Sequence, residues 1–166
     1  MTAQRQLIVM RHAKAGELPG GPDVERALRP RGSRNATAAG QWLAERGFVP
    51  DLVLCSHARR ARQTWQYVSA EIEGEPAVIN DRRLYQADAA DLLEIFAETQ
   101  PQVRSLMYIG HNPAAAAVAE ILTGDQVDFP TSAIAVIALA TAWASLAGHA
   151  EGAGQLVASW RPQPES

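Results

Sequence analysis

Three short polar segments contain the side chains best suited to chemistry. They are the dipeptide Arg11-His12, residues 56–62 with their arginines, and the tripeptide Gly110-His111-Asn112. Arginine offers a planar fork of hydrogen-bond donors, and a neutral imidazole is a good nucleophile near pH 7. Together these residue types fit a tetrahedral dianion, for which phosphate is the obvious candidate.

Each polar segment directly follows a short apolar run, at residues 7–10, 52–55 and 106–109. Such runs, alternating with segments of helical periodicity, predict buried parallel strands with helices on both faces. The carboxyl ends of parallel strands meet at one edge of a sheet, where ligands bind. The three segments are therefore expected to share one pocket.

The remaining pattern predicts an α/β fold, a three-layer α/β/α sandwich with a mostly parallel sheet. Helices are expected at residues 33–45, 61–71, 91–98 and 113–122, and a weaker strand at 77–80. The last two predicted strands, 133–139 and 156–160, are separated by a glycine-rich turn, which favours an antiparallel edge.

Composition places limits on the function. The 166 residues, 47% of them hydrophobic, fit a single domain spanning 1–166. A net charge of −3 argues against nucleic-acid binding. No apolar stretch is long enough for a membrane span or a signal-peptide core. The single cysteine favours a reducing compartment. We therefore expect a cytoplasmic protein without membrane partners. Cys55 ends an apolar run and is expected to be a buried hydrophobe.

The motifs resemble those of the histidine phosphatase superfamily. The resemblance rests on Arg11-His12, on Ser56-x-x-x-Arg60-Ala61-x-Gln63-Thr64 and on Gly110-His111, in this order and each at a strand end. Segments 23–28, 110–113 and 130–134 extend it over almost the whole chain, and with the short length they most resemble the SixA-type phosphohistidine phosphatases. The resemblance implies a phosphoglycerate-mutase-like fold.

The same resemblance implies roles for four residues. His12 would attack phosphorus and carry the phosphoryl group, while Arg11, Arg60 and His111 would surround the transferring oxygens. One ring nitrogen of His12 must then face phosphorus while the other donates to a fixed acceptor, for which we expect a backbone carbonyl. A bound dianion should keep His111 protonated. No metal or other cofactor is expected, because the strand-end loops pair two histidines with no carboxylate beside them.

Further candidates lie near the expected pocket. Asp23 and Arg26 are predicted to form the wall of its entrance; the alternative is an ordinary surface ion pair, which stabilises little. Lys14 is a candidate for steering anionic substrates, with a plain surface role as the alternative.

Ser56, Asn112 and Thr131 are also candidates for lining the pocket. Ser56 has the alternative, which we favour, of capping the following helix, and the other two that of satisfying loop backbone. Arg59 and Arg62 have no assigned role beyond surface or ion-pair residues.

The usual proton donors of the family are missing. Many relatives that cleave phosphate esters have a glutamate where this chain has Gln86, and a second branch has an aspartate where it has Asn112. General acid catalysis contributes roughly 10²–10⁴-fold, so simple esters should react slowly unless Asp88 or Asp91 reaches the leaving group. Phosphohistidine needs less help, because its leaving imidazole titrates near neutrality.

The sequence therefore predicts a cofactor-independent phosphatase acting on phosphohistidine in a protein, with a phosphotransfer protein as the expected partner. A general small-molecule phosphomonoesterase of the same fold is the first alternative. A non-catalytic phosphopeptide-binding module is the second, although binding alone would not need a nucleophile such as His12.

Overall fold

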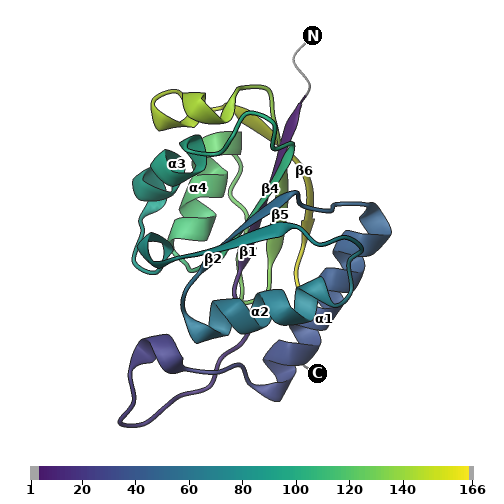
Figure 1. The fold of residues 1–166 in the computed structure, drawn as a ribbon, viewed down its shortest axis with the longest axis vertical. Coiled ribbons are helices and arrows are strands. Elements are labelled where there is room, and N and C mark those ends of the chain that lie inside the picture. The colour runs from purple at the N-terminus through teal and green to yellow at the C-terminus, as the bar shows by residue number, and fades with distance from the viewer. Residues whose placement is uncertain (1–3, 165–166) are drawn as a thin grey trace.

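A six-stranded sheet forms the middle of the molecule (Figure 1). The computed structural model describes residues 4–164, so the outermost residues of the predicted domain lie outside the described part. The strands are β1 (Arg5–Arg11), β2 (Leu52–Ser56), β3 (Ala77–Asp81), β4 (Ser105–Gly110), β5 (Ile134–Leu139) and β6 (Gly154–Trp160). Every expected strand is present, with ends that lie within two residues of the prediction.

The strand order is β3-β2-β4-β1-β5-β6. The pairs β2–β3, β2–β4 and β1–β4 are parallel, whereas β5 runs antiparallel to both β1 and β6. The predicted parallel sheet with an antiparallel edge is confirmed. Strands β1, β2 and β4 consequently end at the same edge of the sheet, and the three polar segments follow them there.

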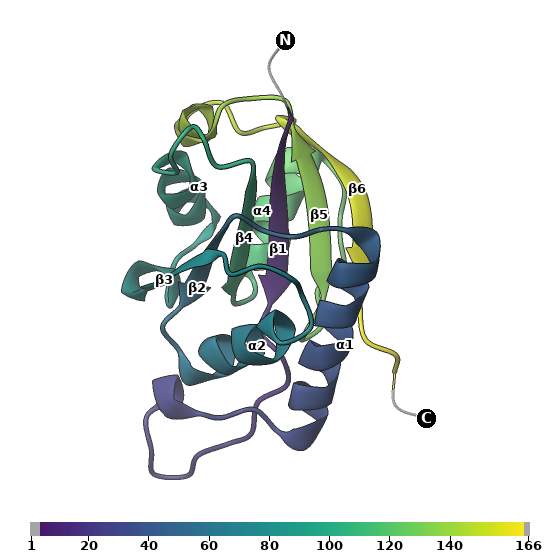
Figure 2. The ribbon, with the colours of Figure 1, turned by 45° about the vertical axis from the view of Figure 1, so that its right-hand side comes forward.

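Helices cover both faces of the sheet (Figure 2). They are α1 (Pro30–Arg46), α2 (Arg59–Ser69), α3 (Ala89–Ala97) and α4 (Ala114–Thr123), with short 3₁₀ helices η1 (Asp23–Glu25), η2 (Arg82–Leu84) and η3 (Trp143–Ala147). Leu7 and Val9 pack on the side of α3 and α4, while the alternate residues Ile8 and Met10 pack on the side of α1 and α2. These two cores confirm the three-layer sandwich.

Helix ends show where the sequence prediction was inexact. Helix α1 ends as expected at Gly47, whose φ of 72° suits a glycine C-cap, but it begins at Pro30 rather than residue 33. Helix α3 begins at Ala89 rather than residue 91, because Asp88 and Asp91 form a reciprocal capping box at its start.

Helix α2 begins at Arg59, two residues before the predicted start. This difference matters because it puts Arg60 in the first turn, where its side chain is buried beneath the loop that follows β1. The helix N-cap, Ala58, makes no side-chain cap. The first turn of α2 therefore has no side-chain cap, and it buries the cationic side chain of Arg60.

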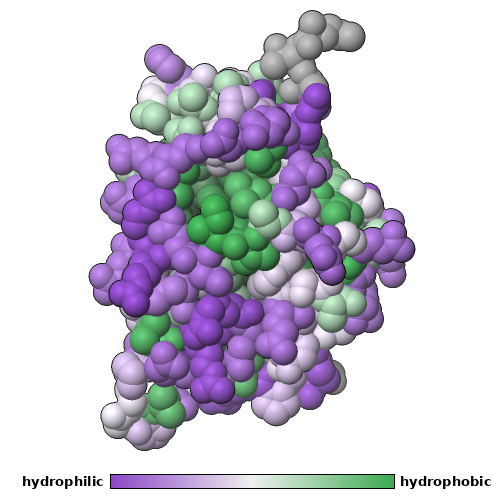
Figure 3. Space-filling view, viewed as in Figure 1, coloured by the Kyte–Doolittle hydropathy of each residue, from purple (hydrophilic) through white to green (hydrophobic). Residues whose placement is uncertain are grey.

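None of the helices within residues 4–164 is both long and apolar enough to cross a bilayer. Hydrophobic residues gather near the middle of the face drawn in Figure 3, with hydrophilic residues around them. Edge strand β3 leaves Val78 and Ile79 exposed, at 38% and 48%.

Candidate active site

A pocket of about 380 Å³ lies at the carboxyl edge of β1, β2 and β4. It contains three arginines and one carboxylate, so its charge favours an anion. Its lining residues are Arg11, His12, Asp23, Arg26, Arg60, Tyr85, Gln86, His111 and Asn112. The structure thus brings together all four residues that the sequence resemblance singles out, from three loops distant in the chain.

Backbone contacts on both sides fix His12. Its N–H donates to the carbonyl of Gly110 at 2.9 Å, and its carbonyl accepts from the N–H of Ser132 at 3.0 Å. The ring Nδ1 lies 2.8 Å from the Ala13 carbonyl. Since a carbonyl can only accept, Nδ1 carries the proton and Nε2 keeps its lone pair. The sequence led us to expect a backbone carbonyl as the acceptor, and the structure identifies it as that of Ala13.

The environment keeps the His12 ring neutral. Burial lowers its pKa to about 3, and the nearby cationic groups of Arg60 and Arg11, together with His111, act in the same direction. The hydrogen bond to the Ala13 carbonyl opposes this lowering only in part. His12 therefore presents a neutral, lone-pair nitrogen to the pocket at physiological pH.

Arg60 uses all its nitrogens within the pocket. Its Nε donates to His12 Nε2 at 3.3 Å, Nη1 donates to the Asp23 carbonyl at 2.9 Å, and Nη2 pairs with Asp23 Oδ2 at 3.1 Å. Buried Thr64 joins the helix to the loop after β1, because its Oγ1 donates to the Arg60 carbonyl and accepts from the Ala13 N–H. The two chain segments therefore hold each other in register.

His111 lies opposite the His12 ring, with the ring centroids 5.2 Å apart. Its Nε2 is 2.8 Å from Ser56 Oγ, and its backbone N–H donates to the Tyr108 hydroxyl. Burial, followed by the charge of Arg60, lowers the pKa of His111 to about 4. A neighbouring dianion would raise this pKa, so protonation of His111 when phosphate binds remains a prediction.

Ser56 does not cap α2, contrary to the role we favoured from its position. Its Oγ accepts instead from the N–H of Ala58, the N-cap residue itself, at 3.2 Å. The short turn after β2 leaves the fully buried hydroxyl facing His111. Ser56 therefore orients the His111 ring.

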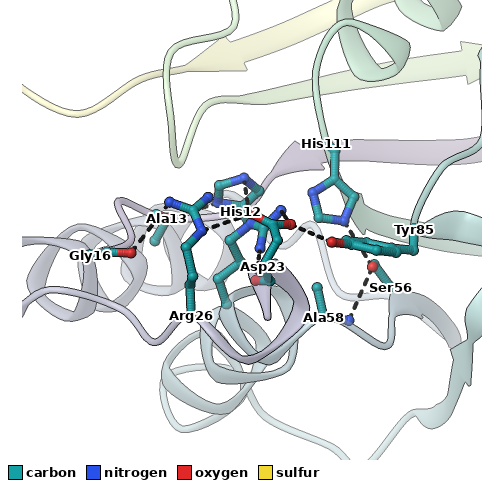
Figure 4. Close-up of polar contacts among 10 residues, drawn as sticks. His12, Ala13, Gly16, Asp23, Arg26, Ser56, Ala58, Tyr85 and His111 are labelled. Atoms are coloured by element: carbon teal, nitrogen blue, oxygen red, sulfur yellow. Dashed lines mark hydrogen bonds and ion pairs between the residues drawn. The ribbon is translucent and has the colours of Figure 1, made fainter. Parts of the chain in front are cut away.

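Asp23 lies between Arg26 and Tyr85 in Figure 4. Its Oδ1 accepts from Arg26 Nε at 2.9 Å, and its Oδ2 accepts from the Tyr85 hydroxyl and from Arg60. The Tyr85 hydrogen bond, and then Arg60, lower the pKa of Asp23 to about 2. Asp23 and Arg26 thus both line the pocket, and Asp23 has further partners besides their ion pair.

Tyr85 is the pocket residue that the sequence reasoning missed. Its ring meets that of His111 edge-on at 5.6 Å, and the Arg60 guanidinium lies 5.9 Å from its centroid. The signal that could have found it is its place beside Gln86, which the sequence resemblance assigns to the family's acid position.

Arg11 and Asn112 both bind the loop before β5. Arg11 Nη1 and Asn112 Nδ2 donate to the carbonyl of Phe129, at 3.1 and 2.9 Å, and Asn112 Oδ1 accepts from the N–H of Ala116. Burial and Arg60 lower the pKa of Arg11. Asn112 thus lines the pocket and also satisfies loop backbone, the two roles that the sequence left open.

Four basic or polar candidates lie away from this pocket's lining. Lys14 and Arg59 are exposed, and Thr131 is half-buried. Arg62 is exposed and donates to the carbonyl of His57 at 2.9 Å. Pocket lining by Thr131 therefore gains no support from the geometry, and steering by the exposed Lys14 stays a prediction.

Gln86, which the sequence resemblance assigns to the family's acid position, is an exposed residue of the pocket lining. Asp88 and Asp91 do not line this pocket, because each side chain accepts from the other's backbone N–H at the start of α3. Asp23 is therefore the only carboxylate among the lining residues, and its low pKa keeps it ionised.

Other chemical sites are less suitable. Cys55 is fully buried, and burial raises the pKa of its thiol to about 12. A larger cavity, of about 540 Å³, lies beside α3 and η3, but Glu94 and Glu151 give it the wrong charge for phosphate. The described residues include no group of three or more metal-ligating acids, histidines or cysteines.

Fold and site together define an α/β protein with an anion pocket built around two histidines and three arginines. Residues 7–128 match the model of the histidine phosphatase superfamily, branch 1, and the chain belongs to this superfamily. An uncharacterized protein of Mycobacterium tuberculosis is 36% identical over 148 residues, covering 82% of this chain and 91% of the relative.

Solved structures agree with the SixA resemblance. A candidate SixA phosphohistidine phosphatase from Nakamurella multipartitia is 31% identical, with a TM-score of 0.83 and coverage of 96% of this chain and 97% of that one. The protein histidine phosphatase SixA complexed with tungstate is 25% identical, with a TM-score of 0.77 and coverage of 93% and 95%. The predicted family, its SixA-like character and the mutase-like fold are confirmed.

Proposed function

We propose that this protein hydrolyses phosphohistidine on a protein through a phosphoryl intermediate on His12. The carrying observation is the orientation of that ring: Nδ1 is tied to the Ala13 carbonyl, while the unprotonated Nε2 faces Arg60 at 3.3 Å. Membership of the superfamily supports a phosphatase, and the SixA proteins support the phosphohistidine substrate.

In the first step, the Nε2 lone pair of His12 attacks phosphorus and forms a new P–N bond. The bond to the substrate's imidazole breaks, and its electron pair stays on the leaving nitrogen. When the second nitrogen of that imidazole is protonated, which occurs near neutral pH, the ring leaves as neutral imidazole. Arg11 and Arg60 offset the charge of the phosphoryl oxygens, and His111 joins them as a donor once protonated.

In the second step, water attacks phosphorus and releases inorganic phosphate. In the intermediate, Nδ1 of the phosphorylated His12 ring keeps its proton and donates it in a hydrogen bond to the Ala13 carbonyl. The ring therefore carries a positive charge, and when the P–N bond breaks, His12 is released as neutral imidazole. The water proton passes to phosphate or solvent. The same hydrogen bond that directs the attack therefore also activates the intermediate, and no metal or other cofactor takes part in this scheme.

The leaving group decides between the substrate classes. Gln86 and Asn112, which the sequence resemblance assigns to the positions of the two family acids, line the pocket, and neither amide can release a proton. Asp23 has a pKa of about 2 and stays ionised, which removes it as a donor. An alkoxide leaving group would therefore go unassisted, and this weakens the alternative of a general phosphomonoesterase.

A side-by-side comparison tests this proposal. We expect a phosphohistidine protein, such as a phosphotransfer protein, to be hydrolysed at least about 100-fold faster than a phosphoserine peptide or a sugar phosphate. This factor is the rate that the two esters lose when no general acid protonates the leaving group. Similar rates on all three would overturn the specificity. His12→Ala should abolish turnover on every substrate but retain phosphate binding; retained turnover would exclude His12 as the nucleophile, and a wild type that binds phosphate without turnover would favour the binding-module alternative.

A further inference from the structure

A second cavity, of about 360 Å³, adjoins the active-site pocket, and we call it the alanine groove. It lies between the segment leading into α3 and the start of α4. Its lining residues are Tyr85, Gln86, Ala87, Asp88, Ala89, His111, Asn112, Pro113, Ala114 and Ala117. The volume falls within the range of roughly 300–1,000 Å³ that is usual for small-ligand pockets.

The groove and the active-site pocket share a wall. Tyr85, Gln86, His111 and Asn112 line both cavities. The edge-to-face pair of Tyr85 and His111 lies on this shared wall, with an interplanar angle of 73°. A molecule whose phosphoryl group occupies the pocket would therefore extend its remaining part into the groove.

The chemistry of the groove differs from that of the pocket. It contains no arginine, and the residues that it does not share with the pocket are four alanines, Pro113 and Asp88. The carboxylate of Asp88 is held by the N–H of Asp91. Such a lining is poor for phosphoryl oxygens and suits a flat ring, and the Tyr85 ring and the Gln86 amide lie on the wall that the groove shares with the pocket.

We infer that the alanine groove is the leaving-group subsite, which receives the imidazole ring and apolar stem of the substrate's phosphohistidine. This inference rests on the proposed function and adds a place for the departing ring. Its consequence is that selectivity for phosphohistidine comes from two sources: the absence of an acid, which disfavours alkoxides, and a groove whose small side chains leave room for a ring.

Adjacent alanines on α4 provide a matched test. Ala117 lines the groove, whereas Ala116 packs partly against the core and lines a separate cavity with Glu120 and Asp128. We expect Ala117→Leu to raise the KM for free phosphohistidine about 10-fold or more, since a misfitted methylene group costs that much in a binding pocket. Ala116→Leu should leave it within 2-fold.

Phosphoramidate separates the groove from the chemistry, because it has the same P–N bond but no ring. We expect Ala117→Leu to hydrolyse phosphoramidate at the wild-type rate and to retain the wild-type inhibition constant for inorganic phosphate. An unchanged KM for phosphohistidine in Ala117→Leu would overturn the groove assignment. Failure of the wild-type protein to hydrolyse a phosphohistidine protein would instead overturn the proposed function.

A second pair of alanines, at the start of α3, controls for the case in which a substitution on α4 damages that helix. Ala89 lines the groove and its neighbour Ala90 lines the cavity beside η3. Ala89→Leu should repeat the selective loss on phosphohistidine, and Ala90→Leu should not. If Ala117→Leu lost activity on both substrates, an unaffected Ala89→Leu would contradict the inference, and a selective loss in Ala89→Leu would support it.

Discussion

Arg60 Nε lies 3.3 Å from His12 Nε2 and donates a hydrogen bond to it. This contact occupies the lone pair that must attack phosphorus, so an incoming phosphoryl group has to displace it. Arg60 can then turn the same donor toward the phosphoryl oxygens, while its other nitrogens remain bound to Asp23. Before substrate binds, the hydrogen bond between Arg60 and His12 thus holds both side chains in place.

Replacing Arg60 by lysine should lower kcat about 10²–10³-fold, because a lysine cannot reproduce the three-directional fork that contacts His12 and Asp23. Steady-state kinetics on phosphohistidine would measure this. Arg59→Lys is the matched control, since Arg59 is the exposed neighbour on the same helix. Equal effects of the two changes would refute a special role for Arg60.

The Asp23 carboxylate forms an ion pair with Arg60 and adds a negative charge to the pocket lining, which opposes phosphate binding. We expect Asp23→Asn to lower the inhibition constant of inorganic phosphate about 5-fold, because an ion pair with a half-exposed carboxylate stabilises by up to about 1 kcal/mol. Asp128→Asn, which removes an exposed ion pair with Arg161, is the control. Weaker phosphate binding in Asp23→Asn would show that Asp23 mainly positions Arg60.

Restoring a carboxyl group at the family's acid position should create esterase activity. Gln86→Glu is expected to raise hydrolysis of a sugar phosphate at least about 10-fold, toward the range of general acid catalysis, while changing phosphohistidine hydrolysis little. Gln155→Glu, on edge strand β6, controls for the added charge. Unchanged ester hydrolysis would mean that the leaving group departs elsewhere.

Acidification should destabilise the fold through its two active-site histidines. Their pKa values are lowered from 6.5 to about 3 for His12 and about 4 for His111. Between about pH 4 and 6.5 the unfolded chain therefore binds more protons, and the free energy of unfolding falls as pH decreases. Each histidine contributes up to about 1.4 kcal/mol per pH unit in this window.

Urea unfolding at pH 7, 6 and 5 would measure this slope. His111→Gln removes one of the two groups and should flatten it. A variant that retained the full slope would contradict the low pKa of His111.

Gly110 should be intolerant of a side chain. A Cβ atom there would lie 2.0 Å from the Tyr108 hydroxyl, which accepts a hydrogen bond from the His111 backbone. We expect Gly110→Ala to cost about 1–3 kcal/mol in the free energy of unfolding and to lower kcat by displacing His111. Gly148→Ala, with open space around the new carbon, should be neutral by the same unfolding and kinetic measurements.

The sequence alone determined the layers and the edge at which chemistry occurs. Short apolar runs and helical periodicity suffice for this, because the need to bury apolar surface acts on every residue of an element. The order Arg11-His12, Arg60, His111 along the chain was enough to predict their meeting, since parallel strands bring such ends together. Helix starts were less predictable, as the capping box at Asp88 shows.

Only the tertiary structure decided which polar atoms meet. Ser56 faces His111 instead of capping a helix, Ala13 supplies the carbonyl for His12, and Tyr85 joins Asp23 from a distant segment. Such contacts depend on distances of a few tenths of an ångström between loops, and a hydrogen bond leaves no periodic trace in the sequence. The residue types were therefore enough to predict the kind of chemistry, whereas tertiary packing determines which hydrogen-bond partners orient the reacting side chains.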